Sequence, residues 1–263
     1  MKKPSVLLAA GMLVLTLSGC SARVSPDTHS TAVPAGTTAP TAPRADAVTP
    51  KELNSSQLLG GNAKPSFPAG EAGKVSVVAQ GQLSKTEGMD SGILLIAYRN
   101  NTSKAVAHVD FTVAAKAGGK VVASGNSQTG SIPAQVQPGE VALDYIYFSN
   151  VASIPDAGVT YEFQAQTSPA DTSPYNTAAL KVTQADNNGS AIIGVASNPT
   201  DKTLQNPFGV YAYCFEGDSI ASYVESFAKP DAVLTPGGEV TFSIDLYDRK
   251  CDSFVLGVSG YFS

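Results

Sequence analysis

Histidine and cysteine are scarce in this chain, which has two histidines and three cysteines among 263 residues. Redox or metal centres that need closely spaced cysteines or neighbouring histidines are therefore not expected. His29 lies in a Pro/Thr-rich segment, and His108 stands alone at the head of a predicted strand. We predict no catalytic residue, no cofactor and no enzyme activity. Ser or Asp side chains gathered around His108 in a cleft would instead favour a hydrolase.

The signature motifs of common enzymes are missing or incomplete. The chain has no Gly-x-Ser-x-Gly, no P-loop and no dinucleotide-binding fingerprint. Asp90-Ser91-Gly92 matches a short aspartic-protease signature, but those enzymes need two copies to form a carboxylate pair. Ser226-Phe227-Ala228-Lys229 matches a Ser-x-x-Lys motif, but no Lys-Thr-Gly follows it. These gaps favour a non-enzymatic protein.

Clustered carboxylates near the C-terminus raise the question of calcium, which prefers oxygen ligands. Glu239 and three aspartates could form a weak site at a domain end: Asp245, Asp248 and Asp252. A solvated loop explains the same residues more simply. We predict no metal site.

Basic residues are in the minority, with 17 Lys and Arg against 22 Asp and Glu. If the chain is cleaved before Cys20, it loses Lys2 and Lys3, and its formal net charge becomes about −7. An acidic chain of this kind argues against nucleic acid and against an anionic bilayer face as binding partners.

Long apolar runs are also missing, apart from Val6 to Leu17 behind two lysines. This run is too short to cross a hydrocarbon core of about 30 Å, and a basic start followed by such a run is typical of a secretory signal. Leu17-Ser18-Gly19-Cys20 resembles the bacterial lipobox, whose cysteine is acylated before cleavage. We predict a signal peptide over 1–19 and a lipid-anchored Cys20 on the extracytoplasmic face of the cell membrane. The alternative is an ordinary signal peptide with a chance cysteine.

A tether is predicted over residues 20–72. From Ser21 to Pro50 the chain is rich in Ala, Thr, Pro and Ser and has no aromatic residue, so it cannot bury enough apolar surface to fold. Thr49-Pro50-Lys51-Glu52 is typical of a helix start, and Gly60-Gly61 would end that short helix. Leu53, Leu58 and Leu59 would pack it on the first domain; the alternative is an irregular linker.

Beyond Gly73 the chain consists of short runs rich in Val, Ile, Tyr and Phe, separated by turn residues, which predicts strands. The first six expected strands are 75–79, 93–99, 106–116, 121–125, 141–149 and 159–165. The second six are 180–184, 191–197, 209–215, 219–223, 239–247 and 254–262.

The two sets of strands form an internal repeat at an offset of 98 residues. This offset places Asn100, Thr102 and Lys104 on their counterparts at 198, 200 and 202, and Gly119 on Gly217. Pro138-Gly139 falls on 236–237, and after one inserted residue Glu140-Val141 falls on 239–240. The order of matching turn residues indicates two copies of one fold.

The repeat predicts an all-β protein with two tandem immunoglobulin-like β-sandwich domains, over residues 73–168 and 179–263. The two domains are joined by a linker of about ten residues, between Ser168 and Ala179, and are expected to sit end to end. Val141, Leu143 and Tyr145 alternate with Ala142 and Asp144, which predicts a strand with one buried face and one face in water.

Cys214 and Cys251 are the cysteines that remain once Cys20 is acylated. An oxidising compartment and the absence of both cysteines from the first copy predict a disulfide between them. A redox or metal-binding pair is the functional alternative.

The motifs 100–104 and 198–202, the Gly-Lys-Val-Val at 119–122 and the Pro-Gly-Glu at 138–140 resemble those of FxLYD-type immunoglobulin-like repeats in lipoproteins of high-GC Gram-positive bacteria. The resemblance implies a sandwich fold and no catalytic residues. We therefore expect a cell-surface lipoprotein that acts as a non-enzymatic binding or scaffolding module, with an envelope protein or cell-wall component as partner. The alternative is a small-molecule or ion-binding lipoprotein with a site between the two domains, which requires a cleft there with convergent polar groups.

Overall fold

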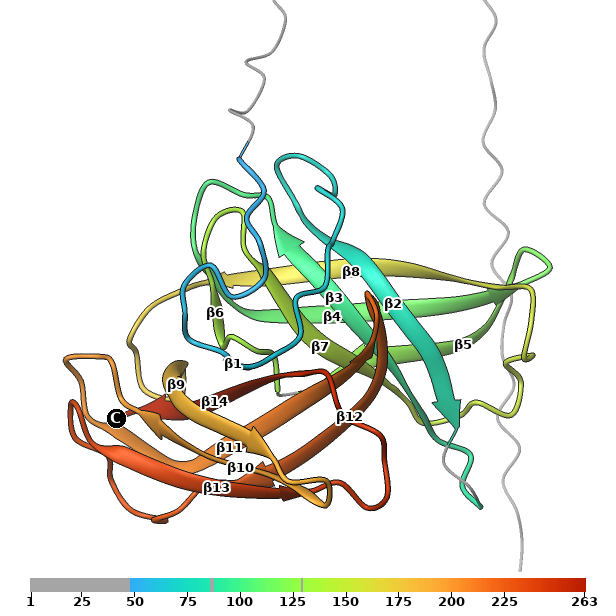
Figure 1. Ribbon diagram of the computed structural model, residues 1–263. Coiled ribbons are helices and arrows are strands. Elements are labelled where there is room, and N and C mark those ends of the chain that lie inside the picture. Colours follow the sequence, from blue (N-terminus) through green and yellow to red (C-terminus); the bar gives the residue numbers. More distant parts are fainter. Residues whose placement is uncertain (1–47, 86–87, 129) are drawn as a thin grey trace, which may run out of the picture. The chain divides into compact units, whose positions relative to one another are not determined.

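The computed structural model describes residues 48–85, 88–128 and 130–263. Cys20, the predicted signal peptide and residues 20–47 of the predicted tether lie outside this range. The described residues form fourteen strands and no helix, which confirms the all-β fold class (Figure 1). No helix in this part of the chain is long and apolar enough to span a membrane.

The first sandwich is built from two antiparallel layers. One layer has the order β2 (Val75–Lys85), β3 (Gly92–Asn100) and β7 (Val141–Phe148). The other has β5 (Lys120–Ser127), β4 (Val106–Ala117) and β8 (Val159–Pro169), with the short β6 (Gln135–Val136) beside β4. The layers join where residues 125–127 of β5 pair with β7. Apolar side chains from both layers fill the space between them.

The second sandwich repeats this order. β9 (Thr177–Asn187), β10 (Ala191–Ser197) and β13 (Glu239–Asp245) form one layer; β12 (Ser219–Phe227), β11 (Leu204–Glu216) and β14 (Phe254–Phe262) form the other. When the strands of each copy are numbered in chain order, leaving out the short β6, the two layers have the orders 1-2-5 and 6-3-4. This is the arrangement of strands A-B-E and F-C-C′ of the immunoglobulin fold.

The Asn-x-Thr-x-Lys motif has the same structural role in both copies. Asn100 Oδ1 accepts hydrogen bonds from the backbone N and the Oγ1 of Thr102, at 3.0 and 2.7 Å, and its Nδ2 donates to the carbonyl of Lys104 at 2.8 Å. Asn198 makes the same three contacts with the residues two and four positions later, at 3.0, 2.8 and 2.8 Å. Both asparagines are buried. The motif therefore shapes a loop through local side-chain to backbone bonds.

The offset of 98 residues fails along β4 and β11. The ladder between β11 and β14 skips from Gln205 to Gly209, a longer bulge than the one in β4, which skips from Ala107 to Asp110. Beyond it the copies match at an offset of 99, so the turn after Ala117 matches the turn after Glu216. The predicted match of Gly119 with Gly217 is therefore wrong by one residue, because a bulge adds a residue without a partner.

The predicted inserted residue before β7 is also wrong. Arg99 pairs with Val141 and Ser197 pairs with Glu239, so β7 and β13 still match at an offset of 98. Asp144 therefore occupies the position of Phe242. The residue paired with each on the neighbouring strand compensates for the difference in size. The smaller Asp144 lies opposite Ile96, and the larger Phe242 lies opposite Gly194. A Cβ atom on Gly194 would lie 2.5 Å from the Phe242 ring.

Both faces of β7 are buried over its first four residues, Val141 to Asp144, which contradicts the predicted water-facing side; only Tyr147, near the end of the strand, is exposed. Ala142 and Ile146 point into the first sandwich with Asp144 between them, and Val141 and Leu143 belong to a third apolar cluster. That cluster contains residues of the second sandwich as well: Tyr213, Phe215, Ile220 and Val255. The two sandwiches therefore pack through broad apolar faces within one compact unit, and the expectation that they sit end to end is wrong.

Residues 48–72, which we predicted to belong to the tether, pack on the sandwiches and contain no helix. Asn54 and Gln57 have φ of 62° and 57°, which a right-handed helix does not accept. Leu59 is buried as predicted, and the next two residues form β1 (Gly60–Gly61), which pairs with β14. Arg99 donates to the carbonyls of Lys51, Phe67 and Pro68 at 2.6, 3.1 and 3.1 Å. A buried guanidinium thus fastens this segment.

Candidate functional site

A groove with a volume of about 450 Å³ lies where the two sandwiches meet. We call it the His108 groove. The first sandwich contributes residues from β4 and from the segment after β5, which include His108, Asp110, Gln128 and Ser131. The second sandwich contributes Pro207, Tyr211, Phe227 and Tyr261. One wall is therefore mainly polar and the other mainly aromatic.

His108 lies in this groove because β4 bulges there. The ladder between β4 and β8 skips from Ala107 to Asp110, and His108 has a φ of 43°, which few residues other than glycine adopt. Bulges redirect side chains and are common beside functional sites. His108 and Asp110 are both exposed on the groove wall.

Two glycines give the Tyr211 ring its position. A Cβ atom on Gly130 would lie 3.0 Å from the ring, and one on Gly209 would lie 2.6 Å from the Tyr211 hydroxyl. The Tyr211 ring also stacks on the ring of Tyr223, and the two ring centroids are 6.4 Å apart. Burial, followed by the charge of Glu225, raises the pKa of Tyr211 to about 12, so its hydroxyl stays neutral. The aromatic wall is therefore fixed by close backbone approach.

A buried carboxyl lies directly behind the groove. Ser131 lines the groove and donates its hydroxyl to Asp144 Oδ2 at 2.7 Å, while Asp144 Oδ1 accepts from the backbone N of Tyr145 at 2.7 Å. Asp144 is 0% exposed. Burial raises its pKa to about 7, against the lowering effect of these two hydrogen bonds. Its charge state therefore changes near neutral pH.

The groove gathers His108 with Asp110 and three serines, Ser127, Ser131 and Ser259, which is the arrangement that would favour a hydrolase. The hydroxyls of Ser127 and Ser131 have protein partners. Ser131 donates to Asp144, and Ser127 Oγ accepts from the backbone N of Phe111 at 2.8 Å. Within the described ranges, none of the three serines is hydrogen-bonded to His108, so the structure has brought the residues together without forming a nucleophile and base pair.

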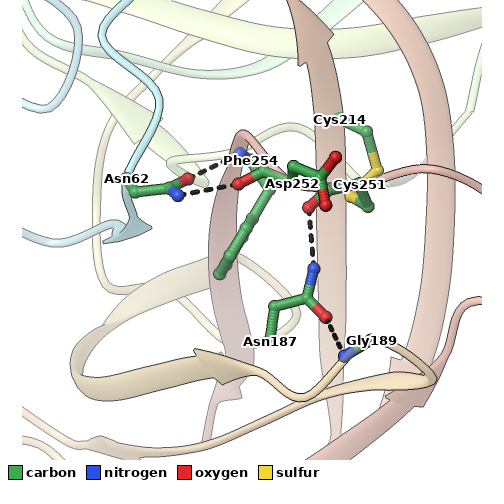
Figure 2. Close-up of a disulfide and its surroundings, with 7 residues drawn as sticks. All are labelled: Asn62, Asn187, Gly189, Cys214, Cys251, Asp252 and Phe254. Atoms are coloured by element: carbon green, nitrogen blue, oxygen red, sulfur yellow. Dashed lines mark hydrogen bonds between the residues drawn. A yellow bond between two sulfur atoms is a disulfide. The ribbon is translucent and has the colours of Figure 1, made fainter.

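The disulfide forms as predicted. Cys214 of β11 and Cys251 before β14 are bonded, with their Cα atoms 4.9 Å apart. Figure 2 shows how the surrounding loop is held. Asn187 Nδ2 donates to the carbonyl of Cys251 at 2.9 Å, and the Asn62 side chain bridges the carbonyl of Asp252 and the backbone N of Phe254 at 2.8 and 2.9 Å. The disulfide and these hydrogen bonds together hold the loop before β14 in the second sandwich.

Other residues that the sequence singled out are dispersed. In the part of the chain with described coordinates, no three His, Cys, Asp or Glu side chains gather to hold a metal ion. The sequence pattern does not indicate that Tyr211 and Phe227 line a groove or that Asp144 is buried. An aspartate within an alternating apolar strand is the one signal that was present.

No protein-family model and no curated protein matches this sequence.

Proposed function

We propose that this protein is a lipoprotein, anchored through Cys20 on the extracytoplasmic face of the cell membrane, that acts as a non-enzymatic binding module of the envelope. The observation that carries the proposal is the His108 groove, whose polar wall faces an aromatic wall. Sites of this composition bind ligands through apolar contact and a few directed hydrogen bonds. The resemblance to FxLYD-type lipoprotein repeats is part of the same proposal.

The ligand that fits this groove has an apolar face beside hydroxyl or amide groups, as sugars and short peptides of a cell envelope do. Phe227 is 59% exposed and offers a free aromatic surface, while Asp110 and Gln128 offer an acceptor and an amide. This composition favours a soluble envelope ligand, so the site between the sandwiches is our leading candidate. An envelope protein that docks over the same groove is the second candidate.

We expect Phe227→Ser to weaken ligand binding at least tenfold, because it removes the most exposed part of the aromatic wall. Binding is measured by titrating peptidoglycan fragments, oligosaccharides and short peptides into the unacylated chain 43–263, following tyrosine fluorescence and thermal shift. Val121→Ser is the matched control, since Val121 is 57% exposed but does not line the groove. Equal affinities for the two variants would contradict the groove as the binding site.

Cys20→Ala should release the protein from membranes into the soluble fraction, because the acyl chains provide the proposed anchor. Fractionation with labelling by a radioactive fatty acid measures this. Cys214→Ala, which leaves Cys20 intact, should keep both the label and the membrane association. A Cys20→Ala protein that stays in the membrane fraction would refute the lipid anchor without affecting the groove.

A further inference from the structure

The two sandwiches differ at one sheet edge, the outer edge of their last strand. In the second sandwich, residues 177–180 of β9 cross to the other layer and pair with residues 258–261 of β14. β1 then covers the adjoining stretch, with Gly60 opposite Leu256 and Gly61 opposite Val255. Two separate strands therefore cover the edge of β14.

In the part of the chain that the structure describes, no strand covers the same edge of the first sandwich. Phe111 pairs with Ala165 as Val210 pairs with Val258, so residues 165–168 of β8 are the counterpart of the covered stretch. The segment that would cover them, residues 72–75, stays beside β3 instead. Gly73 N donates to the carbonyl of Asn101, and Asn101 N donates to the carbonyl of Lys74, both at 3.0 Å. Among the strands that the structure describes, β8 pairs with β4 alone.

A groove of about 500 Å³ remains where the covering strand would lie. We call it the β8 groove; Figure 1 shows the two strands, β2 and β8, that border it. Its lining includes the apolar residues Val75, Val77, Phe111, Phe163 and Ala165, and also an exposed ion pair between Lys74 and Glu71. Along β8 the inward-facing side chains are half-buried or exposed, whereas nearly all of β14 is buried. Part of the apolar interior of the first sandwich is therefore accessible to solvent along β8.

Free edges are normally protected against pairing by lysine, proline or inward-facing charge. β8 contains no lysine, and its one proline, Pro169, is its last residue, beyond the stretch 165–168. Its one charged residue, Glu162, is held by Lys116 at 2.6 Å on the outward side. The edge therefore keeps backbone groups available for a further strand.

We propose that β8 accepts an extended segment of another protein, which pairs antiparallel with residues 165–168 and places small apolar side chains at alternate positions into the β8 groove. The second sandwich defines this chemistry, because its covering strand has Ala178 and Leu180 buried, at 3% and 0% exposure, and runs antiparallel to β14. Backbone hydrogen bonds provide affinity in such strand addition, and alternate side chains provide specificity. Prolines at 26, 34, 40 and 43 make the chain's own residues 20–47 a poor donor.

The test uses a fluorescein-labelled peptide with the sequence of residues 176–182, Asn-Thr-Ala-Ala-Leu-Lys-Val, titrated into the unacylated chain 43–263. We expect saturable binding by fluorescence anisotropy and slower amide exchange in β8. A peptide of the same composition, with its leucine moved by one position, should bind at least tenfold more weakly, because its apolar side chains then lie on opposite faces.

Two lysine substitutions on the same strand locate the site. Ala165→Lys puts a charge into the β8 groove and should weaken peptide binding at least tenfold. Gln166→Lys adds the same charge on the outward face and should leave binding unchanged. Both positions are exposed, so both variants should keep the wild-type melting temperature.

The proposal is overturned if the peptide does not bind, if both lysine variants bind it equally, or if β8 exchange is unchanged. A wild-type chain that dimerises while Ala165→Lys stays monomeric would assign the edge to a second copy. A chain from residue 20 that excludes the peptide, while the chain from residue 43 binds it, would assign the edge to this protein's own N-terminal segment.

Discussion

Asp144→Asn should abolish most of the dependence of folding stability on pH between about pH 4 and pH 7. Burial raises the pKa of Asp144 from 3.8 to about 7 in the folded state. Between those values the folded protein keeps a proton that the unfolded chain has released, so stability falls as pH rises through this window and is flat above it. At about 1.4 kcal/mol per pH unit, the expected loss is about 4 kcal/mol.

The measurement is the free energy of unfolding of the chain 43–263 in urea at several pH values, for the wild type and Asp144→Asn. Asp245→Asn is the matched control, because it removes the same charge from an exposed position on β13. The wild type and the control should lose stability together toward pH 7, and Asp144→Asn should not. Parallel curves for all three proteins would contradict the buried, neutral carboxyl.

The groups around Asp144 make the expected titration simple. Asp110 is the other acid whose charge acts on it, and it raises the pKa of Asp144 further. Tyr98 and Tyr213 are fully buried, and burial together with the charge of Asp144 raises the pKa of both hydroxyls. They remain neutral while Asp144 titrates. Asp144 therefore changes charge beneath the wall of the His108 groove while these two hydroxyls stay neutral, and a ligand bound there is exposed to that change.

Much of the fold could be predicted from local signals. Alternating apolar runs located the strands, and matching turn residues located the repeat, because each signal acts within a few residues. The Asn100 and Asn198 motifs are local too, since each asparagine bonds residues two and four positions ahead. Local chemistry determines such elements before the sandwiches meet.

The faces of β7 could not be predicted in the same way. Alternation shows that successive residues face opposite sides, but it cannot show what covers each side. The apolar residues Val141 and Leu143 suggested the core of a sandwich, yet they pack against the second sandwich. The other face, with Ala142 and Asp144, is the true interior. When one buried face of a strand contains an acidic residue, the sequence shows the same alternation as a strand with one face in water.

The candidate sites depend on the same long-range packing. His108 and Tyr211 are far apart in sequence, and the groove exists only because the two sandwiches meet. The helix predicted after Thr49 is missing because Arg99 and the edge of β14 take the backbone groups of that segment. These partners lie far along the chain, beyond the reach of any local pattern.

Loss of the disulfide should destabilise the second sandwich by about 4 kcal/mol. Cys214 and Cys251 are separated by 37 positions, and releasing a loop of this size restores that much chain entropy to the unfolded state. The double variant Cys214→Ala, Cys251→Ala is a fair test, because the first sandwich has Ala115 at the position that matches Cys214 along β4 and β11. The variant should fold, with a lower free energy of unfolding in urea.

Reductant supplies the control. Reduced and refolded wild type should lose about as much stability as the double variant, and the double variant should not respond to reductant at all. Hydrogen exchange should show the loss first in β13 and β14, because the disulfide and Asn62 together hold the loop between them. A wild type that keeps its stability after reduction would show that the hydrogen bonds of Asn62 and Asn187 hold the loop between β13 and β14 without the covalent bond.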